Sequence, residues 1–308
     1  MSGTDELESL YSAIEDAARL LDVPCSRDTV WPILTTYGAA YGEALLQTVM
    51  AFRVATDARH AQELDCRFAL LSKDVDPYDL AVSKGLIAET DHPVGALLAE
   101  LRERFPIDSY GIDFGVVAGF TKAWPFFPPE DLQQLSKLAE IPSMPRSVAD
   151  NVDLFARHGL EDKVGLLGID YYDRTVNVYF GTPPPECFEP ATIKTMVREM
   201  GLPEPSDQLL TLGQQAFALY ATYSWDSPNV ERICYAVMTP DPTTLPVHID
   251  PKIQQFARNA SRDAAAGRFV YAVALTPKGE YHKLQSYYQW RQRTLDLMSV
   301  SEPAADPS

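Results

Sequence analysis

The spacing of apolar residues changes from a helical to a strand-like period near residue 48. Before that point apolar side chains recur at helical spacing, with Leu7, Leu10 and Ile14 on one stripe of a helix predicted over residues 5–23. A second helix is predicted over 25–47. From residue 48 onward apolar side chains alternate every second residue, which is typical of strands. The chain therefore begins with helices and continues into a sheet.

The predicted strands come in pairs joined by short turns rich in Asp, Pro, Asn and Gly, the residues that tight turns require. The five pairs are 48–55 with 62–71, 108–117 with 119–127, 163–172 with 175–181, 215–225 with 230–238, and 267–276 with 280–288. Segments of helical period are found at 76–86, 92–105, 145–160, 189–202, 250–266 and 287–300. A helix–hairpin unit is thus repeated five times without an evident sequence repeat.

Ten strands joined by hairpins leave two exposed edges unless the sheet closes on itself. Closure into an antiparallel barrel removes both edges, and the helices then cover the outer face. A barrel of ten strands leaves a lumen wide enough for a ligand. We therefore expect an α+β fold: a ten-stranded antiparallel β-barrel of five αββα repeats in one domain over 1–300, with a disordered tail at 301–308.

Side chains two residues apart on a strand share a face, so the lumen side of each strand can be predicted. In the first hairpin Asp65 shares a face with Arg67. The opposite, apolar face of that strand is expected to hold Leu64, Cys66, Phe68 and Leu70. Across the five hairpins, five cations fall on faces that also carry aromatic residues: Arg53, Arg67, Lys122, Arg232 and Lys283.

Two interpretations of these cations are open. Antiparallel sheets often have one solvated face, where Lys and Arg are ordinary. The mixture of Trp, Tyr and Phe with the charges favours a closed lumen instead, where an isolated charge costs several kcal/mol. Asp65 and Asp170 are too few to neutralise five cations. A polyanion such as a diphosphate is the expected ligand, because charge-assisted hydrogen bonds contribute about 1.5 to 3 kcal/mol each.

Composition narrows the function classes. The formal net charge of −17, from 26 Lys and Arg against 43 Asp and Glu, disfavours binding to nucleic acid or to an anionic membrane. The four cysteines are scattered and predict reduced thiols. Neither a signal peptide nor an apolar run of membrane-spanning length is present, so we expect a cytoplasmic protein. An acidic closed barrel gives no special reason to associate, so we expect a monomer. Nucleotide-binding glycine loops and a DDxxD motif are absent, and "DVDPYD" at 74–79 is interpreted as a turn into a helix.

The stretches "ELDCRFAL", "GFTKAWPFFP", "DYYDRTVNVYF", "ERICYAVMTPDPT" and "TPKGEYHKLQSYY" resemble the soluble bacterial aromatic prenyltransferases of the ABBA (αββα) barrel family, in particular its phenazine-prenylating branch. The likeness covers nearly the whole chain in the right order. It implies an enzyme that transfers an isoprenyl group from an allylic diphosphate to an electron-rich aromatic ring.

The resemblance also implies roles for individual residues. Diphosphate binding is expected of Arg53, Arg67, Lys122, Asn177, Tyr220, Arg232 and Lys283. The shield around the allyl cation would comprise Tyr179, Tyr220 and Tyr287. The acceptor pocket would comprise Trp124, Gly165, Phe217, Ala218, Ala236, Val270 and Gln285. Glu280 and His282 are the candidate bases, although strand parity places Glu280 opposite to Lys283, where it would be an ordinary exposed turn residue.

Departures from the family pattern refine the expectation. Members that use magnesium have an aspartate at the position of Asp65 and small hydroxyl residues where this chain has Arg53 and Arg67. Two guanidinium groups can supply the charge of the ion, so we expect no metal or other cofactor. Trp124 offers an indole face for a flat polycycle, and with Gln285 it shortens the space for the isoprenoid.

The expected co-substrate is therefore dimethylallyl diphosphate, with geranyl diphosphate as the alternative. A dihydrophenazine carboxylate is the first choice of acceptor and a hydroxynaphthoquinone the second. A non-catalytic carrier of an acidic aromatic molecule is the remaining alternative.

Overall fold

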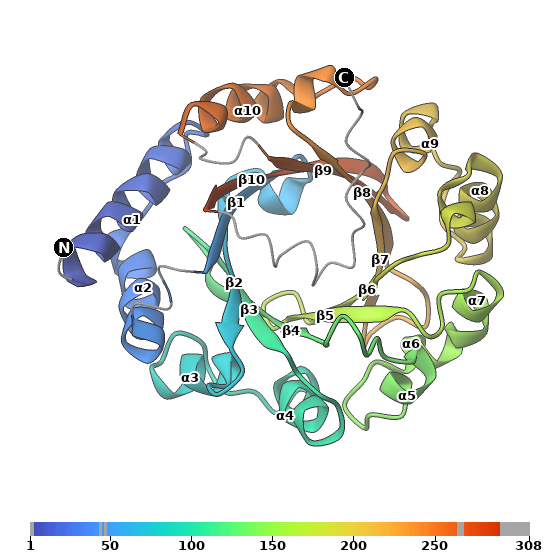
Figure 1. Ribbon diagram of the computed structural model, residues 1–308, viewed down its shortest axis with the longest axis horizontal. Helices are drawn as coiled ribbons and strands as arrows, with labels where there is room; N and C mark the ends of the chain where they lie inside the picture. The colour runs from blue at the N-terminus through green and yellow to red at the C-terminus, as the bar shows by residue number, and fades with distance from the viewer. Residues whose placement is uncertain (1–2, 43–44, 46–47, 264–267, 290–308) are drawn as a thin grey trace.

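In the computed structural model, which describes residues 3–42, 45, 48–263 and 268–289, ten strands close into a barrel (Figure 1). Their order around the barrel is β1-β10-β9-β8-β7-β6-β5-β4-β3-β2, and all neighbouring pairs are antiparallel. The strands are β1 (Val49–Ala55), β2 (Asp65–Ser72), β3 (Ser109–Gly115), β4 (Gly119–Phe126), β5 (Val164–Asp170), β6 (Thr175–Phe180), β7 (Ala218–Ser224), β8 (Arg232–Thr239), β9 (Phe269–Thr276) and β10 (Gly279–Gln289).

The barrel is closed by strands from the two ends of the sequence. β1 lies beside β10 in Figure 1, with Ala51 opposite Tyr287 and Arg53 opposite Gln285. Every strand then has two hydrogen-bonded neighbours, so no edge is left unpaired. The predicted ten-stranded antiparallel barrel is confirmed.

Helices form a ring outside the barrel (Figure 1). They are α1 (Gly3–Arg19), α2 (Arg27–Tyr41), α3 (Pro77–Ser83), α4 (Val94–Arg104), α5 (Leu135–Ala139), α6 (Arg146–Asp150), α7 (Val152–Arg157), α8 (Pro190–Glu199), α9 (Asp207–Gly213) and α10 (Pro251–Asp263). Short 3₁₀ turns are η2 (Ala58–His60), η3 (Pro185–Phe188) and η4 (Pro242–Thr244). No helix in the described part of the chain is long and apolar enough to cross a membrane.

Several element boundaries differ from the prediction. The helix predicted over 145–160 is divided into α6 and α7 at Asn151, and the short helices α5 and α9 had not been predicted. The last predicted helix, 287–300, is wrong at its start because β10 continues to Gln289. The rest of that helix and the tail expected at 301–308 lie outside the described residues.

Polar caps determine where two of the helices begin. The side chain of Ser26 accepts a hydrogen bond from the amide of Asp28 at the start of α2. Asp76 accepts from the amides of Tyr78 and Asp79 at the start of α3, and Pro77 occupies the first turn. "DVDPYD" is therefore a turn into a helix, as predicted.

The apolar side chains form one core outside the barrel and two smaller clusters inside it. The outer core joins strand residues such as Ile112 and Ile233 to helix residues such as Leu97. One lumen cluster surrounds Trp124, and the other surrounds Tyr220. Since alternate residues of a strand face opposite sides, both faces of the sheet are covered and any ligand site must lie in the lumen.

A β-bulge in β2 changes the face of one predicted residue. The pairing of β2 with β3 shifts between Ala69 and Leu71, and Leu70 has a φ of 65°. Leu70 consequently packs against the lumen cluster around Trp124. The prediction that it shares the outer face with Phe68 was wrong, because the bulge inserts a residue and reverses the alternation.

Candidate active site

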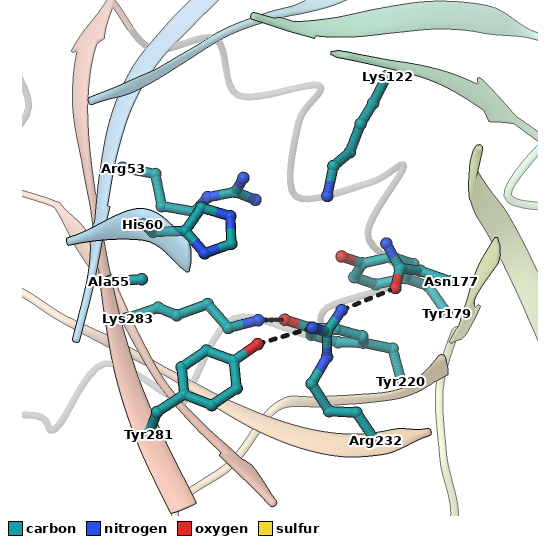
Figure 2. A pocket seen from close by; sticks show the side chains of 10 residues that line it. All are labelled: Arg53, Ala55, His60, Lys122, Asn177, Tyr179, Tyr220, Arg232, Tyr281 and Lys283. Carbon is teal, nitrogen blue, oxygen red and sulfur yellow. Dashed lines mark hydrogen bonds between the residues drawn. The ribbon is translucent and has the colours of Figure 1, made fainter. Parts of the chain in front are cut away.

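A pocket in the lumen gathers four cations from four different strands (Figure 2). We call it the cationic pocket. Its lining consists of Arg53, Ala55, His60, Lys122, Asn177, Tyr179, Tyr220, Arg232, Tyr281 and Lys283. It adjoins a wider mouth of about 790 Å³ formed by the β1–β2, β5–β6, β7–β8 and β9–β10 connections. Side chains far apart in the sequence thus meet because each lies on the lumen face near the same end of its strand.

Arg232 and Lys283 lie in this pocket with only neutral hydrogen-bond partners. Arg232 donates from Nη1 to the hydroxyl of Tyr281 at 2.7 Å and from Nη2 to Oδ1 of Asn177 at 3.1 Å. Lys283 Nζ donates to the hydroxyl of Tyr220 at 2.5 Å. Within the described residues neither cation forms an ion pair with a carboxylate. Two buried cations without counter-charge are costly, so this side of the pocket favours an anionic ligand.

The electrostatic surroundings of Lys283 oppose its charge. Burial lowers the pKa of Lys283 well below its usual value, and the charges of Arg232, Arg53 and Lys122 lower it further. Tyr220 and the other lumen hydroxyls stay neutral because burial raises the pKa of Tyr220 well above its usual value. An anion bound among these cations would raise the pKa of Lys283 again.

The other three cations are paired with carboxylates. Arg53 Nη2 lies 3.0 Å from Oδ2 of Asp65, and Arg53 Nη1 lies 3.5 Å from Oδ2 of Asp113. Arg67 makes a two-point contact with Asp113, at 2.6 and 2.9 Å. Lys122 Nζ lies 2.7 Å from Oδ2 of Asp170. These ion pairs divide the five cations into a neutralised group and an un-neutralised group, Arg232 and Lys283.

Asp113 corrects the expected charge balance. It stands on β3 opposite Arg67 and Lys122 in the strand register, and only 1% of its side chain is exposed. Burial raises the pKa of Asp113, but the charges and hydrogen bonds of Arg67 and the charges of Arg53 and Lys122 lower it to about 2. The prediction that only Asp65 and Asp170 face the five cations was wrong. Strand parity applied to "SYGIDFG" would have placed Asp113 in the lumen.

The position expected of a metal ligand is occupied by an ion pair. Oδ2 of Asp65 accepts from Arg53 Nε at 3.2 Å as well as from Nη2. A divalent cation at this carboxylate would face Arg53 and, beyond it, Arg67. Within the described residues no group of three or more His, Cys, Asp or Glu could hold a metal ion. The residues present therefore do not fit magnesium.

Aromatic rings form the wall next to the un-neutralised cations. The rings of Tyr179 and Tyr220 stack with centroids 4.2 Å apart and planes 22° apart. Trp124 meets Tyr179 edge-on at 5.3 Å. Tyr287 is 2% exposed and lies deeper, in the cluster around Trp124. Stacked tyrosine faces can stabilise a cation that lies against them.

Trp124 fills the floor of the lumen. The guanidinium carbon of Arg67 lies 4.1 Å from the centroid of its ring. A Cβ built at Gly168 would come within 2.5 Å of the six-membered ring, so the indole lies against the bare backbone of β5. With 1% of its surface exposed, Trp124 limits the depth of the lumen. It does not present the open stacking face that the sequence had led us to expect.

Most of the other residues predicted to hold the acceptor lie together. Ala218 is opposite Ala236 in the β7–β8 register, and Phe217 and Val270 pack against the same lumen cluster. Gln285 is opposite Val270 across β9–β10 and is buried. These side chains leave one side of the lumen apolar.

Gly165 does not join them. The β5–β6 pairing shifts between Val164 and Leu166, and a Cβ at Gly165 would face Gly181 and Leu132, 3.7 Å from each. The bulge turns Gly165 away from the apolar side of the lumen.

The two candidate bases lie outside the cationic pocket. The carboxylate of Glu280 accepts hydrogen bonds from the amide and from the hydroxyl of Ser206, both at 2.6 Å, at the start of α9. His282 is opposite Val273, and its ring lies 5.8 Å from Tyr271, a residue of the outer core. Glu280 reaches only the mouth. Neither location gives access to a substrate held among the tyrosines.

Sequence reasoning missed three residues of the cationic pocket, Ala55, Tyr281 and His60. Ala55 lies two residues after Arg53 on β1, so strand parity could have found it. Tyr281 lies two residues before Lys283 on the same strand, so strand parity could have found it. His60 lies in the η2 turn between β1 and β2, where no periodic pattern exists. Only the structure could place it.

Comparison with known proteins identifies the kind of site. The family model described as "Aromatic prenyltransferase Orf2" matches residues 5–296. The chain is 54% identical to the 5,10-dihydrophenazine-1-carboxylate 9-dimethylallyltransferase of Streptomyces anulatus, over 97% of this chain and 99% of that protein. It is 47% identical to the flaviolin linalyltransferase of Streptomyces virginiae, over 94% and 95%. It is 46% identical to the furaquinocin biosynthesis prenyltransferase of Streptomyces sp. (strain KO-3988), over 94% of both.

Proposed function

This chain belongs to the Orf2 family of aromatic prenyltransferases, and we propose that it transfers a dimethylallyl group from dimethylallyl diphosphate to a carbon of a dihydrophenazine carboxylate. The observation that carries the proposal is the position of Arg232 and Lys283, buried next to the stacked rings of Tyr179 and Tyr220 and without a carboxylate partner among the residues that the structure describes. A ligand with an anionic head and an allylic tail complements both features.

The reaction proposed is an electrophilic aromatic substitution. The C–O bond of the donor breaks heterolytically and gives an allyl cation and diphosphate. Arg232, Lys283 and Lys122 stabilise the charge that develops on the diphosphate, with Asn177 holding Arg232 in place. Fixed cations in a lumen that excludes water lower the barrier because they need no reorganisation as the bond breaks.

The tyrosines act on the other half of the donor. Tyr179 and Tyr220 present ring faces to the allyl cation, and Tyr287 closes the deeper side. Cation–π contact contributes about 0.5 to 2 kcal/mol for each ring. Exclusion of water prevents hydrolysis of the cation before the aromatic carbon attacks it.

The last step restores aromaticity. A C–C bond has formed to the ring carbon, and the proton on that carbon must be removed. Glu280 is held by Ser206, and His282 faces the outer core. We therefore assign the proton to the diphosphate just released, which is the basic group nearest to the cation.

We also propose that turnover requires no magnesium. Arg53 and Arg67 lie where a metal ion would otherwise supply positive charge, and Asp65 is engaged by Arg53. Arginine is always charged at working pH and binds in a fixed geometry. In this account Asp65 orients Arg53.

The choice of donor and acceptor rests on the relatives and on the depth of the lumen. The relative at 54% identity is named for a dihydrophenazine carboxylate and a dimethylallyl group. The two at lower identity are named for furaquinocin biosynthesis and for flaviolin with a linalyl group. Trp124 and Gln285 are buried and limit the space for a longer chain. Geranyl diphosphate and hydroxynaphthoquinones are the second choices. Since the closed barrel leaves no strand edge for association, we further propose that the protein acts as a cytoplasmic monomer.

A substrate panel tests the proposal. The protein is incubated with dimethylallyl or geranyl diphosphate and with a dihydrophenazine carboxylate or a set of hydroxynaphthoquinones, and products are identified by mass. We expect the gain of one dimethylallyl group, fastest on the phenazine. Binding of these ligands without product on any acceptor would contradict the proposal and support a carrier.

A further inference from the structure

The β1–β2 loop places a histidine over the cationic pocket. His60 closes the η2 turn and lines both the cationic pocket and the mouth. Its ring points into the pocket in Figure 2, and 19% of its side chain is exposed. It therefore lies where a bound diphosphate would meet solvent.

Asp57 determines which nitrogen of His60 carries a proton. His60 Nδ1 lies 2.8 Å from Oδ1 of Asp57. Burial raises the pKa of Asp57, but the hydrogen bond from His60 and the charges of His60, Arg59 and Lys283 lower it to about 2. Asp57 is thus a carboxylate and can only accept, so Nδ1 donates to it. No described residue hydrogen-bonds to Nε2, which is left for a ligand.

The loop is fastened on two sides. From α10, Lys252 Nζ donates to the carbonyl oxygen of Ala61 at 2.8 Å and to that of His60 at 3.4 Å. From η2, Arg59 Nη1 lies 3.4 Å from Oδ2 of Asp173 in the β5–β6 turn. These contacts hold the loop that carries His60, while the ring itself is held by Asp57.

Charged groups face His60 from every element around it. On the mouth side these are Asp57, Arg59 and Lys252. The other charged residues that line the mouth are Asp170, Asp173, Asp226, Glu231, Lys278 and Glu280. On the pocket side they are the cations Arg53, Lys122, Arg232 and Lys283, together with the neutral hydroxyls of Tyr179, Tyr220 and Tyr281. An anion bound in the pocket would therefore lie among cations and neutral hydroxyls, within the lining that His60 shares.

We propose that His60 is a further diphosphate-binding residue, which binds a terminal phosphate oxygen through Nε2–H as an imidazolium while Nδ1–H donates to Asp57. A neutral imidazole whose Nδ1 carries the proton has no donor at Nε2, so this contact requires the imidazolium. The inference rests on the proposed function for the natural ligand, an allylic diphosphate, but it can be tested with inorganic pyrophosphate alone.

The experiment compares the dissociation constant of inorganic pyrophosphate for the wild type, for His60→Gln and for His248→Gln, by calorimetry from pH 5.5 to pH 8.5. His248 is exposed before α10 and serves as the matched control. The ratio of variant to wild-type constants at each pH removes the ionisation of the ligand itself. We expect His60→Gln to bind about tenfold more weakly at pH 6 and within about twofold of the wild type at pH 8.5.

The inference would be overturned if the ratio of the His60→Gln to the wild-type dissociation constant did not change with pH. It would also be overturned if this ratio stayed near one at every pH. Asp57→Asn supplies a second variant if His60→Gln does not fold. Loss of the Asp57 carboxylate disfavours the imidazolium of His60, so the pH dependence of pyrophosphate binding should lie at lower pH in this variant than in the wild type. The outcome is separable from the proposed function. If product forms but the ratio of dissociation constants does not change with pH, only the role of His60 is contradicted. If the ratio changes with pH but no acceptor gives product, only the proposed prenyl transfer is contradicted.

Discussion

Arg67 and Asp113 form a two-point ion pair inside the barrel, with Nε–Oδ1 at 2.6 Å and Nη2–Oδ2 at 2.9 Å. Asp113 also lies within 3.5 Å of Arg53, so one carboxylate serves two buried guanidinium groups. Asp113→Asn removes the negative charge that the two guanidinium groups share, so it should lower the free energy of unfolding by about 3 kcal/mol. Urea denaturation measures this loss.

Asp65→Asn is the matched control for that prediction. Arg53 keeps its contact with Asp113 in this variant, so the loss should be clearly smaller. Equal losses in the two variants would show that Asp113 does not have the shared role assigned to it.

Lys283→Met should separate stability from function. Burial lowers the pKa of Lys283 in the folded protein, so the unfolded chain binds more protons and wild-type stability rises with pH up to the unfolded pKa of about 10.4. At pH 7 the variant should have a higher free energy of unfolding than the wild type. This difference should be smaller at pH 9, by roughly 1 to 2 kcal/mol. It should also lose prenyl transfer.

Urea denaturation of Lys283→Met at the two pH values, with Lys278→Met as an exposed control from the β9–β10 turn, checks this. A variant whose stability relative to the wild type is the same at both pH values would contradict the assigned pKa direction.

Trp124→Leu should deepen the lumen. The indole fills the floor between Arg67 and Gly168, so the smaller side chain makes room for a longer isoprenoid. The ratio of kcat/KM for geranyl over dimethylallyl diphosphate should rise about tenfold. Trp31→Leu, in α2 outside the barrel, should leave the ratio unchanged. An unaltered ratio in Trp124→Leu would remove Trp124 as the determinant of donor length.

Glu280→Gln and Glu280→Ala should both retain turnover within about twofold. The carboxylate binds the amide and hydroxyl of Ser206, so its loss should destabilise the start of α9 by about 0.5 to 2 kcal/mol. Steady-state kinetics and thermal unfolding on the same samples distinguish these effects. A hundredfold loss of turnover with intact folding would instead identify Glu280 as the base.

The barrel could be predicted from sequence because two periodic signals agree. The alternation of apolar and polar residues predicted the strands, and helical spacing predicted most of the helices. The cost of open sheet edges predicted that the sheet closes into a barrel. Parity then placed Lys122, Arg232 and Lys283 in one lumen, where the structure has them. Parity failed at Leu70 because it adjoins a bulge, which depends on the pairing of two strands and leaves no trace in the alternation of one. Gly165 had been assigned to the acceptor pocket by the family resemblance alone.

Which side chains pair with one another in the lumen was harder to predict than which side chains face it. The pairing of Asp113 with two arginines follows from the register of β2 against β3, which the sequence does not state. His60 lies on a turn without periodicity, and its position is fixed by contacts from α10 and the β5–β6 turn. Long-range contacts of this kind decide which charges are neutralised and which remain for a ligand.

The central claim is that this barrel prenylates an aromatic ring with arginines in place of a metal ion. The direct measurement is the rate of product formation from dimethylallyl diphosphate and a dihydrophenazine carboxylate, followed by mass spectrometry with excess EDTA and again with excess magnesium. We predict a singly dimethylallylated product at the same rate in both. Activity abolished by EDTA and restored by magnesium would contradict the account.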